Sequence, residues 1–71
     1  MELRKPMVAR EARPGARVRV VEDTRRPGLE GMFGTVKGCF GDPQYPALDV
    51  RLEDGRLELF WFYQLEKVGR R

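Results

Sequence analysis

Turn signals divide this chain into strand-length segments, and their spacing constrains the fold more than any other feature. A Pro-Gly pair at 14–15 precedes an alternating run, and an Asp-Gly pair at 54–55 separates two further runs. Asp-Gly between apolar runs is a strong signal for a two-residue β-hairpin. The segment between the two pairs, at 31–36, reads Gly-Met-Phe-Gly-Thr-Val. We expect Gly31 and Gly34 to permit a bulge or a sharp bend in a strand.

Apolar and polar residues alternate in most of these segments, which indicates half-buried strands. In the first segment, Val18 and Val20 lie on one face and Arg19 lies on the other. The expected strands are residues 16–22, 32–38, 47–52, 56–62 and 66–68, with a single helical turn at 63–65 before the last. Their order and spacing predict an all-β fold, a small five-stranded SH3-like barrel with an N-terminal basic arm. The predicted core contains Val18, Val20, Val36, Leu48, Val50, Leu52 and Leu65.

The length of 71 residues is that of one domain. A chain of this size buries only roughly 60% of its unfolded surface, which leaves little core for a deep enclosed active site. Residues 1–13 contain Pro6 and no apolar alternation, so we interpret them as an arm that is extended or disordered until something holds it. The barrel is expected over residues 14–68, and residues 69–71 form a basic tail.

Positive charge is concentrated at the two ends of the sequence. Residues 1–20 carry six basic and two acidic side chains, whereas residues 21–66 carry five basic and nine acidic ones. Residues 67–71 add three basic side chains. A barrel that follows phosphates normally carries Lys and Arg on its own surface. The acidic body therefore favours a protein partner over a nucleic acid.

Composition argues against catalysis. His and Ser are absent, which excludes the Ser-His-Asp and Cys-His arrangements and histidine-based metal sites. Cys39 is the single cysteine, and beside Phe40 we interpret it as a small buried hydrophobe rather than a redox thiol. The carboxylates around the 54–55 turn are expected to be solvated. We expect no enzyme, no cofactor and no metal site.

The strand expected at 56–62 is apolar on both faces. Leu57, Leu59 and Trp61 lie on one face, while Phe60 and Phe62 lie on the other. One face must line the core, and a chain this short has few atoms with which to cover the second. A protein interface is the first interpretation. In the alternative, the basic arm or the long first loop folds over the outer face and makes it ordinary core.

Four segments also carry a resemblance. They read Pro-Gly-Ala-Arg-Val-Arg-Val, Gly-Leu-Glu-Gly-Met-Phe-Gly-Thr-Val, Tyr-Pro-Ala-Leu-Asp-Val-Arg-Leu and Leu-Glu-Lys-Val. Over about residues 14–68, the chain resembles the small SH3-like accessory chains of photosynthetic electron transfer, nearest the variable chain of ferredoxin-thioredoxin reductase. Phe33 replaces an acidic residue of that family. The template is also similar to the ferredoxin-docking subunits of photosystem I and of the cyanobacterial dehydrogenase complex, and to KOW-type nucleic-acid barrels.

The predicted function is a noncatalytic SH3-like binding module, an adaptor or accessory subunit that docks onto a larger protein complex, for which the resemblance implies a redox-related setting. The expected contact residues are Trp61, Tyr63, Phe40, Tyr45, Arg4, Lys5, Arg10 and Arg13. The alternative is a nucleic-acid-binding barrel whose ends hold phosphates while the aromatics stack on bases. A third class is an enzyme built from oligomerised barrels, like the plasmid-borne dihydrofolate reductase. This chain lacks that family's Gln and Tyr at residues 57–60, which argues against this class. With no signal peptide and no apolar run long enough to span a bilayer, we expect a cytoplasmic protein without membrane insertion.

Overall fold

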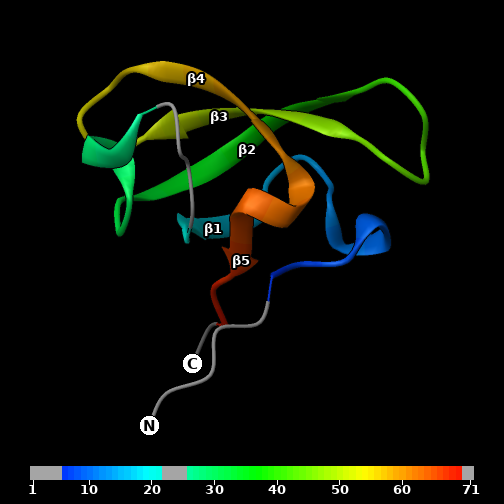
Figure 1. Cartoon of the computed structure of the whole chain (residues 1–71). Helices are drawn as coiled ribbons and strands as arrows, with labels where there is room; N and C mark the ends of the chain where they lie inside the picture. The colour runs from blue at the N-terminus through cyan, green and yellow to red at the C-terminus, as the bar shows by residue number, and fades with distance from the viewer. Residues whose placement is uncertain (1–5, 22–25, 70–71) are drawn as a thin grey trace, which may run out of the picture.

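The protein is a five-stranded antiparallel sheet with three short 3-10 turns (Figure 1). The computed structural model describes residues 6–21 and 26–69. The strands are β1 (Arg17–Val20), β2 (Phe33–Phe40), β3 (Ala47–Leu52), β4 (Leu57–Trp61) and β5 (Leu65–Lys67). The 3-10 turns are η1 (Ala9–Glu11), η2 (Pro27–Leu29) and η3 (Phe62–Gln64). The predicted all-β class and the five antiparallel strands are confirmed, and the predicted helical turn lies one residue earlier than expected.

The strand order is β4-β3-β2-β1-β5, so that β1 lies between β2 and the last strand. The turn η3 carries the chain from β4 to β5 across the open side of the sheet (Figure 1). In the described residues, β4 and β5 are the two edges and do not pair with each other. The sheet is therefore not closed into a barrel by strand pairing. No helix of this part of the chain is long and apolar enough to cross a membrane.

The core lies on the inner face of the curved sheet. All seven predicted core residues are buried, and the strand alternation places them there. The core also contains three residues that were not predicted: Met7, Leu29 and Phe60.

Met7 holds residues 6–13, the described part of the arm predicted at 1–13, against the sheet. Its side chain is buried in the core, and its N–H donates a hydrogen bond to Leu65 O at 2.8 Å. Ala12 packs against the same core. A single apolar residue has no periodicity, so the sequence pattern gave no sign that Met7 would fill the space beside β5. The first five residues lie outside the described part of the chain.

The irregularity in β2 lies at Lys37, where the register with β3 shifts between Val36 and Gly38. The predicted bulge is therefore displaced from Gly31 and Gly34. Gly31 instead forms a turn with a positive φ of 90°. A Cβ on Gly34 would lie 2.7 Å from Arg51 O, so this glycine allows β2 and β3 to approach closely.

Two leucines on adjacent strands provide a test of which face is the core. Leu48 on β3 is fully buried, whereas Leu59 on β4 is 54% exposed. We expect Leu48→Ala to lower the free energy of unfolding by about 2 to 5 kcal/mol, because it leaves a cavity. Leu59→Ala, the matched control, is expected to change it by no more than about 0.5 kcal/mol. Urea denaturation of both variants measures the difference, and equal losses would contradict the assignment of faces.

Candidate functional site

Four aromatic side chains gather where the end of β4 meets the loop between β2 and β3. Tyr45, Trp61, Phe62 and Tyr63 form what we call the aromatic cluster. The ring of Tyr45 lies 5.0 Å from that of Trp61, 5.5 Å from that of Phe62 and 6.0 Å from that of Tyr63. Phe62 and Tyr63 also contact each other edge to face at 5.6 Å. Such tilted and edge-to-face pairs are favourable beyond the area they bury, so the rings hold one another in place.

The loop at 41–46 positions Tyr45. The Tyr45 N–H donates to Asp42 O at 2.8 Å, and the Gln44 N–H donates to Asp42 Oδ1, also at 2.8 Å. Pro46 is buried, and its carbonyl oxygen accepts the Phe62 N–H at 3.2 Å. These bonds fix the loop on η3, and an Asx turn with a following proline is a sequence in which such a loop is stable.

Gln64, the last residue of η3, helps to position Trp61. Its side chain is buried, and its Oε1 accepts the Trp61 N–H at 2.8 Å. A buried amide needs hydrogen-bond partners, and this bond supplies one while it holds the end of β4 against η3. The cluster remains open to solvent, because Tyr45 is 50%, Tyr63 40% and Trp61 39% exposed.

The outer face of β4 continues the apolar surface from Trp61. Phe60 points into the core, so Leu57 and Leu59 point outward, where each remains about half exposed. A shallow hollow of about 240 Å³ lies between Ala47, Leu59, Phe60 and Trp61. The described parts of the N-terminal segment and of the first loop do not cover this face. The alternative interpretation, in which they make it ordinary core, is therefore wrong for those residues.

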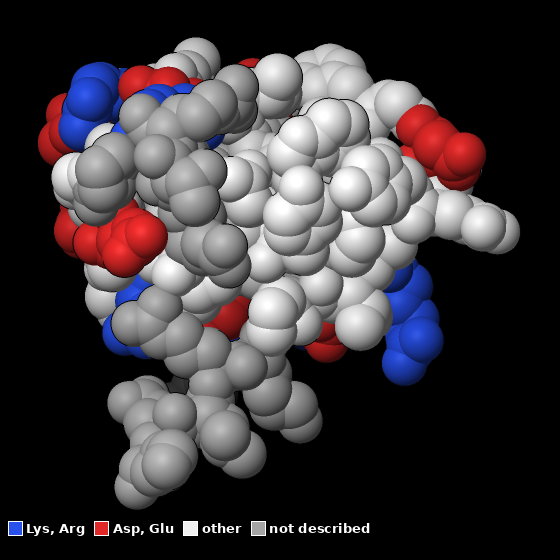
Figure 2. All heavy atoms as spheres, viewed as in Figure 1, with Lys and Arg blue, Asp and Glu red and all other residues white. Residues whose placement is uncertain are grey.

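Charged residues lie at the margins of this surface. Figure 2 shows a face in front of η3, as it appears in Figure 1, where the described residues place no Lys, Arg, Asp or Glu in the middle. Red and blue side chains appear at its left and right edges. An apolar, aromatic centre with a charged rim is the usual composition of a protein interface.

The backbone edge of β4 is already occupied by side chains. Arg26, from the first loop, pairs with Glu58 through Nη1, and its Nη2 donates to Leu59 O at 2.8 Å. The guanidinium also lies over the Phe60 ring, 4.8 Å from its centroid. Together with the Gln64 bond to the Trp61 N–H, this blocks two groups that an added strand would need. A partner would therefore meet the side-chain face of β4 rather than its edge.

The structure brings three of the predicted contact residues together: Trp61, Tyr63 and Tyr45. Phe40 is 54% exposed and lies beside Ala47, which in turn lies opposite Trp61. Phe40 therefore shares the outer face, although no ring contact joins it to the cluster among the described residues. Arg4 and Lys5 lie outside the described residues.

The predicted arginines of the N-terminal segment lie at a different place. Arg10 belongs to η1 and Arg13 to the turn that follows it. Neither takes part in the aromatic cluster.

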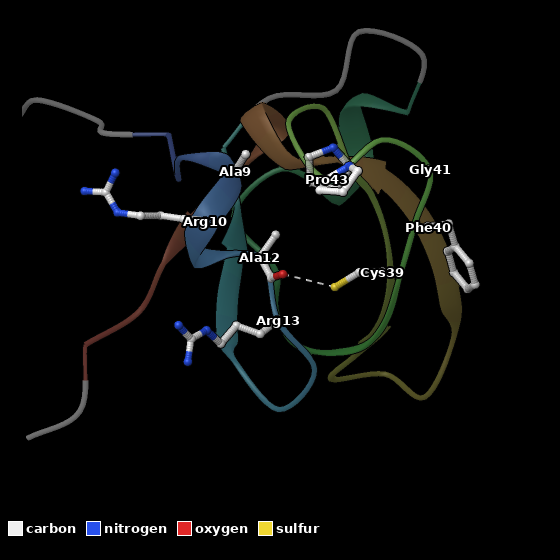
Figure 3. A pocket seen from close by; sticks show the side chains of 9 residues that line it. Ala9, Arg10, Ala12, Arg13, Cys39, Phe40, Gly41 and Pro43 are labelled. Atoms are coloured by element: carbon white, nitrogen blue, oxygen red, sulfur yellow. Dashed lines mark hydrogen bonds between the residues drawn. The ribbon is translucent and has the colours of Figure 1, made fainter.

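Cys39 is exposed, so the prediction that it is a small buried hydrophobe is wrong. It lies in an open hollow of about 360 Å³ between the N-terminal segment and the 41–46 loop (Figure 3). The thiol Sγ lies 3.1 Å from Ala12 O and donates a hydrogen bond to it. Partial burial raises the pKa of the thiol. Both effects favour the protonated thiol over the reactive thiolate.

Sequence reasoning left several residues out of the site. Leu57, Leu59 and Phe62 were noted for their alternation but were not named as contacts, and Gln64 and Arg26 were not considered. Alternation along 57–61 places Leu57 and Leu59 on one face with Trp61, but the expected two-residue turn would have paired Leu57 with the buried Leu52. The outward direction of this face follows from the observed three-residue turn, in which Leu57 pairs with Arg51. Gln64 and Arg26 act through hydrogen bonds to backbone atoms and leave no sequence pattern.

No group of side chains suited to hold a metal ion occurs in the described residues. In comparisons with protein-family models, curated proteins and solved structures, no match to this chain was found.

The thiol of Cys39 gives a pH-dependent prediction. Because its pKa is raised in the folded chain, the rate of alkylation by iodoacetamide is expected to rise with pH around a midpoint above that of the same cysteine in urea-unfolded chain. Mass spectrometry of timed samples measures the rates. A folded-state midpoint below the unfolded one would instead indicate an activated thiolate and would contradict the assignment.

Proposed function

We propose that this chain is a noncatalytic SH3-like binding module, an accessory subunit that docks onto a larger protein through the aromatic cluster and the outer face of β4. The observation that carries the proposal is the exposure of Tyr45, Trp61 and Tyr63 on a surface where their rings contact one another and the Trp61 N–H is bonded to the buried Gln64. Rigid aromatic side chains give a large contact area at a small cost in conformational entropy.

The charge distribution supports a protein partner with an apolar patch of its own. Aromatic rings that stack on nucleic-acid bases normally have cations beside them to hold the phosphates. Among the residues that the structure describes, none in the middle of this face is Lys or Arg (Figure 2). The alternative in which these aromatics bind nucleic-acid bases is therefore less well supported than docking on a protein.

The topology supports the SH3-like part of the proposal. A five-stranded meander whose last strand pairs with the first, with a 3-10 turn before that strand, is the arrangement expected of such a barrel. We infer that the curved sheet is an open form of this barrel. Fold alone does not identify function, so the partner class rests on the surface and not on the topology.

The setting of the interaction stays a proposal taken from the resemblance. An accessory chain of an electron-transfer enzyme would act in the cytoplasm and contribute contacts rather than chemistry. In that setting Arg4 and Lys5 would meet acidic residues of the neighbour.

Trp61→Ala tests the docking surface. Capture by the wild-type chain from a nuclease-treated extract of its source, followed by mass spectrometry, nominates a partner for reconstitution from purified components. We expect Trp61→Ala to weaken the reconstituted complex by about 30-fold, since loss of a central aromatic anchor costs about 2 kcal/mol. Because Trp61 is partly exposed, the variant should remain folded by circular dichroism.

Val8→Ala serves as the control, since Val8 is 45% exposed and does not belong to the aromatic cluster. It should leave the affinity unchanged. Equal binding by wild type and Trp61→Ala would overturn the proposed surface. Unfolding of Trp61→Ala on its own would show that the ring belongs to the core.

A further inference from the structure

A second surface carries three cations, for which the described part of the chain supplies no ion-pair partner. Arg10, Arg13 and Lys67 line one hollow of about 440 Å³, which we call the basic hollow. None of the three forms an ion pair with another described residue. Glu11, Pro14, Gly15 and Ala16 complete the lining. No member of the aromatic cluster takes part in it.

The cations come from separate segments that backbone hydrogen bonds hold together. The Met7 N–H donates to Leu65 O, which ties the segment before η1 to β5. The Gly15 N–H donates to Val36 O at 2.7 Å, which fixes the turn after Arg13. Figure 3 shows the side chains of Arg10 and Arg13 extending to the same side, away from Cys39. The positive charges are thus gathered by the fold and not by a single charged run.

The neighbouring carboxylates are engaged elsewhere. Glu11 Oε1 accepts the Val8 N–H at 3.0 Å. Glu66 Oε2, on β5 beside Lys67, lies 2.8 Å from Arg19 Nε and forms an ion pair with it. The charge of the three cations is therefore offset within the hollow by Glu11 alone, and that carboxylate already has a partner.

The basic ends of the sequence adjoin the same surface. A second hollow shares Arg10, Glu11 and Lys67 with the first and is also lined by Pro6, Val8 and Gly69. Lys5 directly precedes Pro6, and Arg70 directly follows Gly69 in the sequence. Pro6 and Gly69, the described residues that adjoin these charges in the sequence, thus line the neighbouring hollow.

We propose that the basic hollow binds the phosphate backbone of a nucleic acid, without reading its bases and independently of the aromatic surface. Cations that neutralise phosphates gain affinity from the release of counterions, and they need no apolar anchor. An acidic protein partner would normally need an aromatic or large apolar centre within the contact, and the apolar side chains of this lining are the small Pro14 and Ala16. Guanidinium groups also match phosphate oxygens in a bidentate geometry.

The experiment is a fluorescence titration of labelled single-stranded and duplex oligonucleotides with the full chain, over a series of salt concentrations. The first variant, which we call the hollow variant, replaces Arg10, Arg13 and Lys67 by Ala. The control variant replaces Lys37, Arg51 and Arg56 by Ala, which removes the same net charge from exposed residues outside the basic hollow. Circular dichroism confirms that both variants are folded.

We expect wild type to bind oligonucleotides of different sequence alike. The logarithm of its binding constant should fall with the logarithm of salt concentration by about 0.9 per duplex phosphate contacted. The hollow variant should bind about tenfold or more weakly at low salt. The slope of its duplex binding constant against salt concentration should be smaller by roughly 2 to 3. The control variant and Trp61→Ala should both retain the wild-type slope.

Four results would overturn the proposal. The first is no binding by wild type at about 0.05 M salt, where phosphate contacts are strong. The second is an equal loss of affinity in the hollow variant and the control variant, which would indicate an effect of net charge alone. The third is loss of binding in Trp61→Ala, which would indicate base stacking. The fourth is tighter binding of a poly-glutamate peptide than of the oligonucleotides. If the hollow variant loses this binding, the basic hollow would be assigned to an acidic protein. Because Trp61 lies outside the basic hollow, absence of binding or equal losses in the two triple variants leaves the docking proposal standing, whereas loss of binding in Trp61→Ala would count against it as well.

Discussion

The burial of Phe60 against β3 determines how the rest of β4 is used. Phe60 lies opposite Leu48, and both side chains are almost fully removed from solvent. Since side chains alternate along a strand, a buried Phe60 requires Leu57, Leu59 and Trp61 to point outward. A slip of one residue would exchange the two faces and expose Phe60. The apolar outer surface is thus a consequence of the register that builds the core.

Local pattern predicted the strands and the seven core residues because alternation and turn chemistry act over a few residues. The Asp-Gly pair predicted a two-residue turn, but Arg51 pairs with Leu57, so the turn between β3 and β4 contains three residues, 53–55. Three features escaped prediction for physical reasons. Met7 fills the core from a segment without periodicity, Tyr45 reaches Trp61 across sixteen residues of sequence, and the bulge at Lys37 depends on how β2 pairs with β3.

The same division holds for the candidate site. Trp61, Tyr63 and Tyr45 were predicted by residue type, since exposed aromatics are common at interfaces. Their assembly into one cluster depends on long-range contacts: Pro46 O with the Phe62 N–H, and Gln64 Oε1 with the Trp61 N–H. Arg10 and Lys67 were likewise visible as charges, but only the packing of Met7 beside Leu65 explains why they line one hollow.

The aromatic cluster and the basic hollow are separate surfaces that suit different chemistry. The aromatic cluster is uncharged at its centre and fits an apolar protein surface, whereas the basic hollow carries unpaired cations and fits phosphates. A small chain with both could hold a protein and a nucleic acid together.

The central claim is that Trp61 is exposed in the free chain and covered in a complex. Trp61 is the single tryptophan, so intrinsic fluorescence reports on this side chain without labelling. Acrylamide quenching of the free monomer, repeated at increasing dilution to exclude self-association, measures its accessibility directly. We expect acrylamide to quench the Trp61 fluorescence of the free chain and a reconstituted partner to protect it. Full protection of Trp61 in the dilute free monomer would contradict the account.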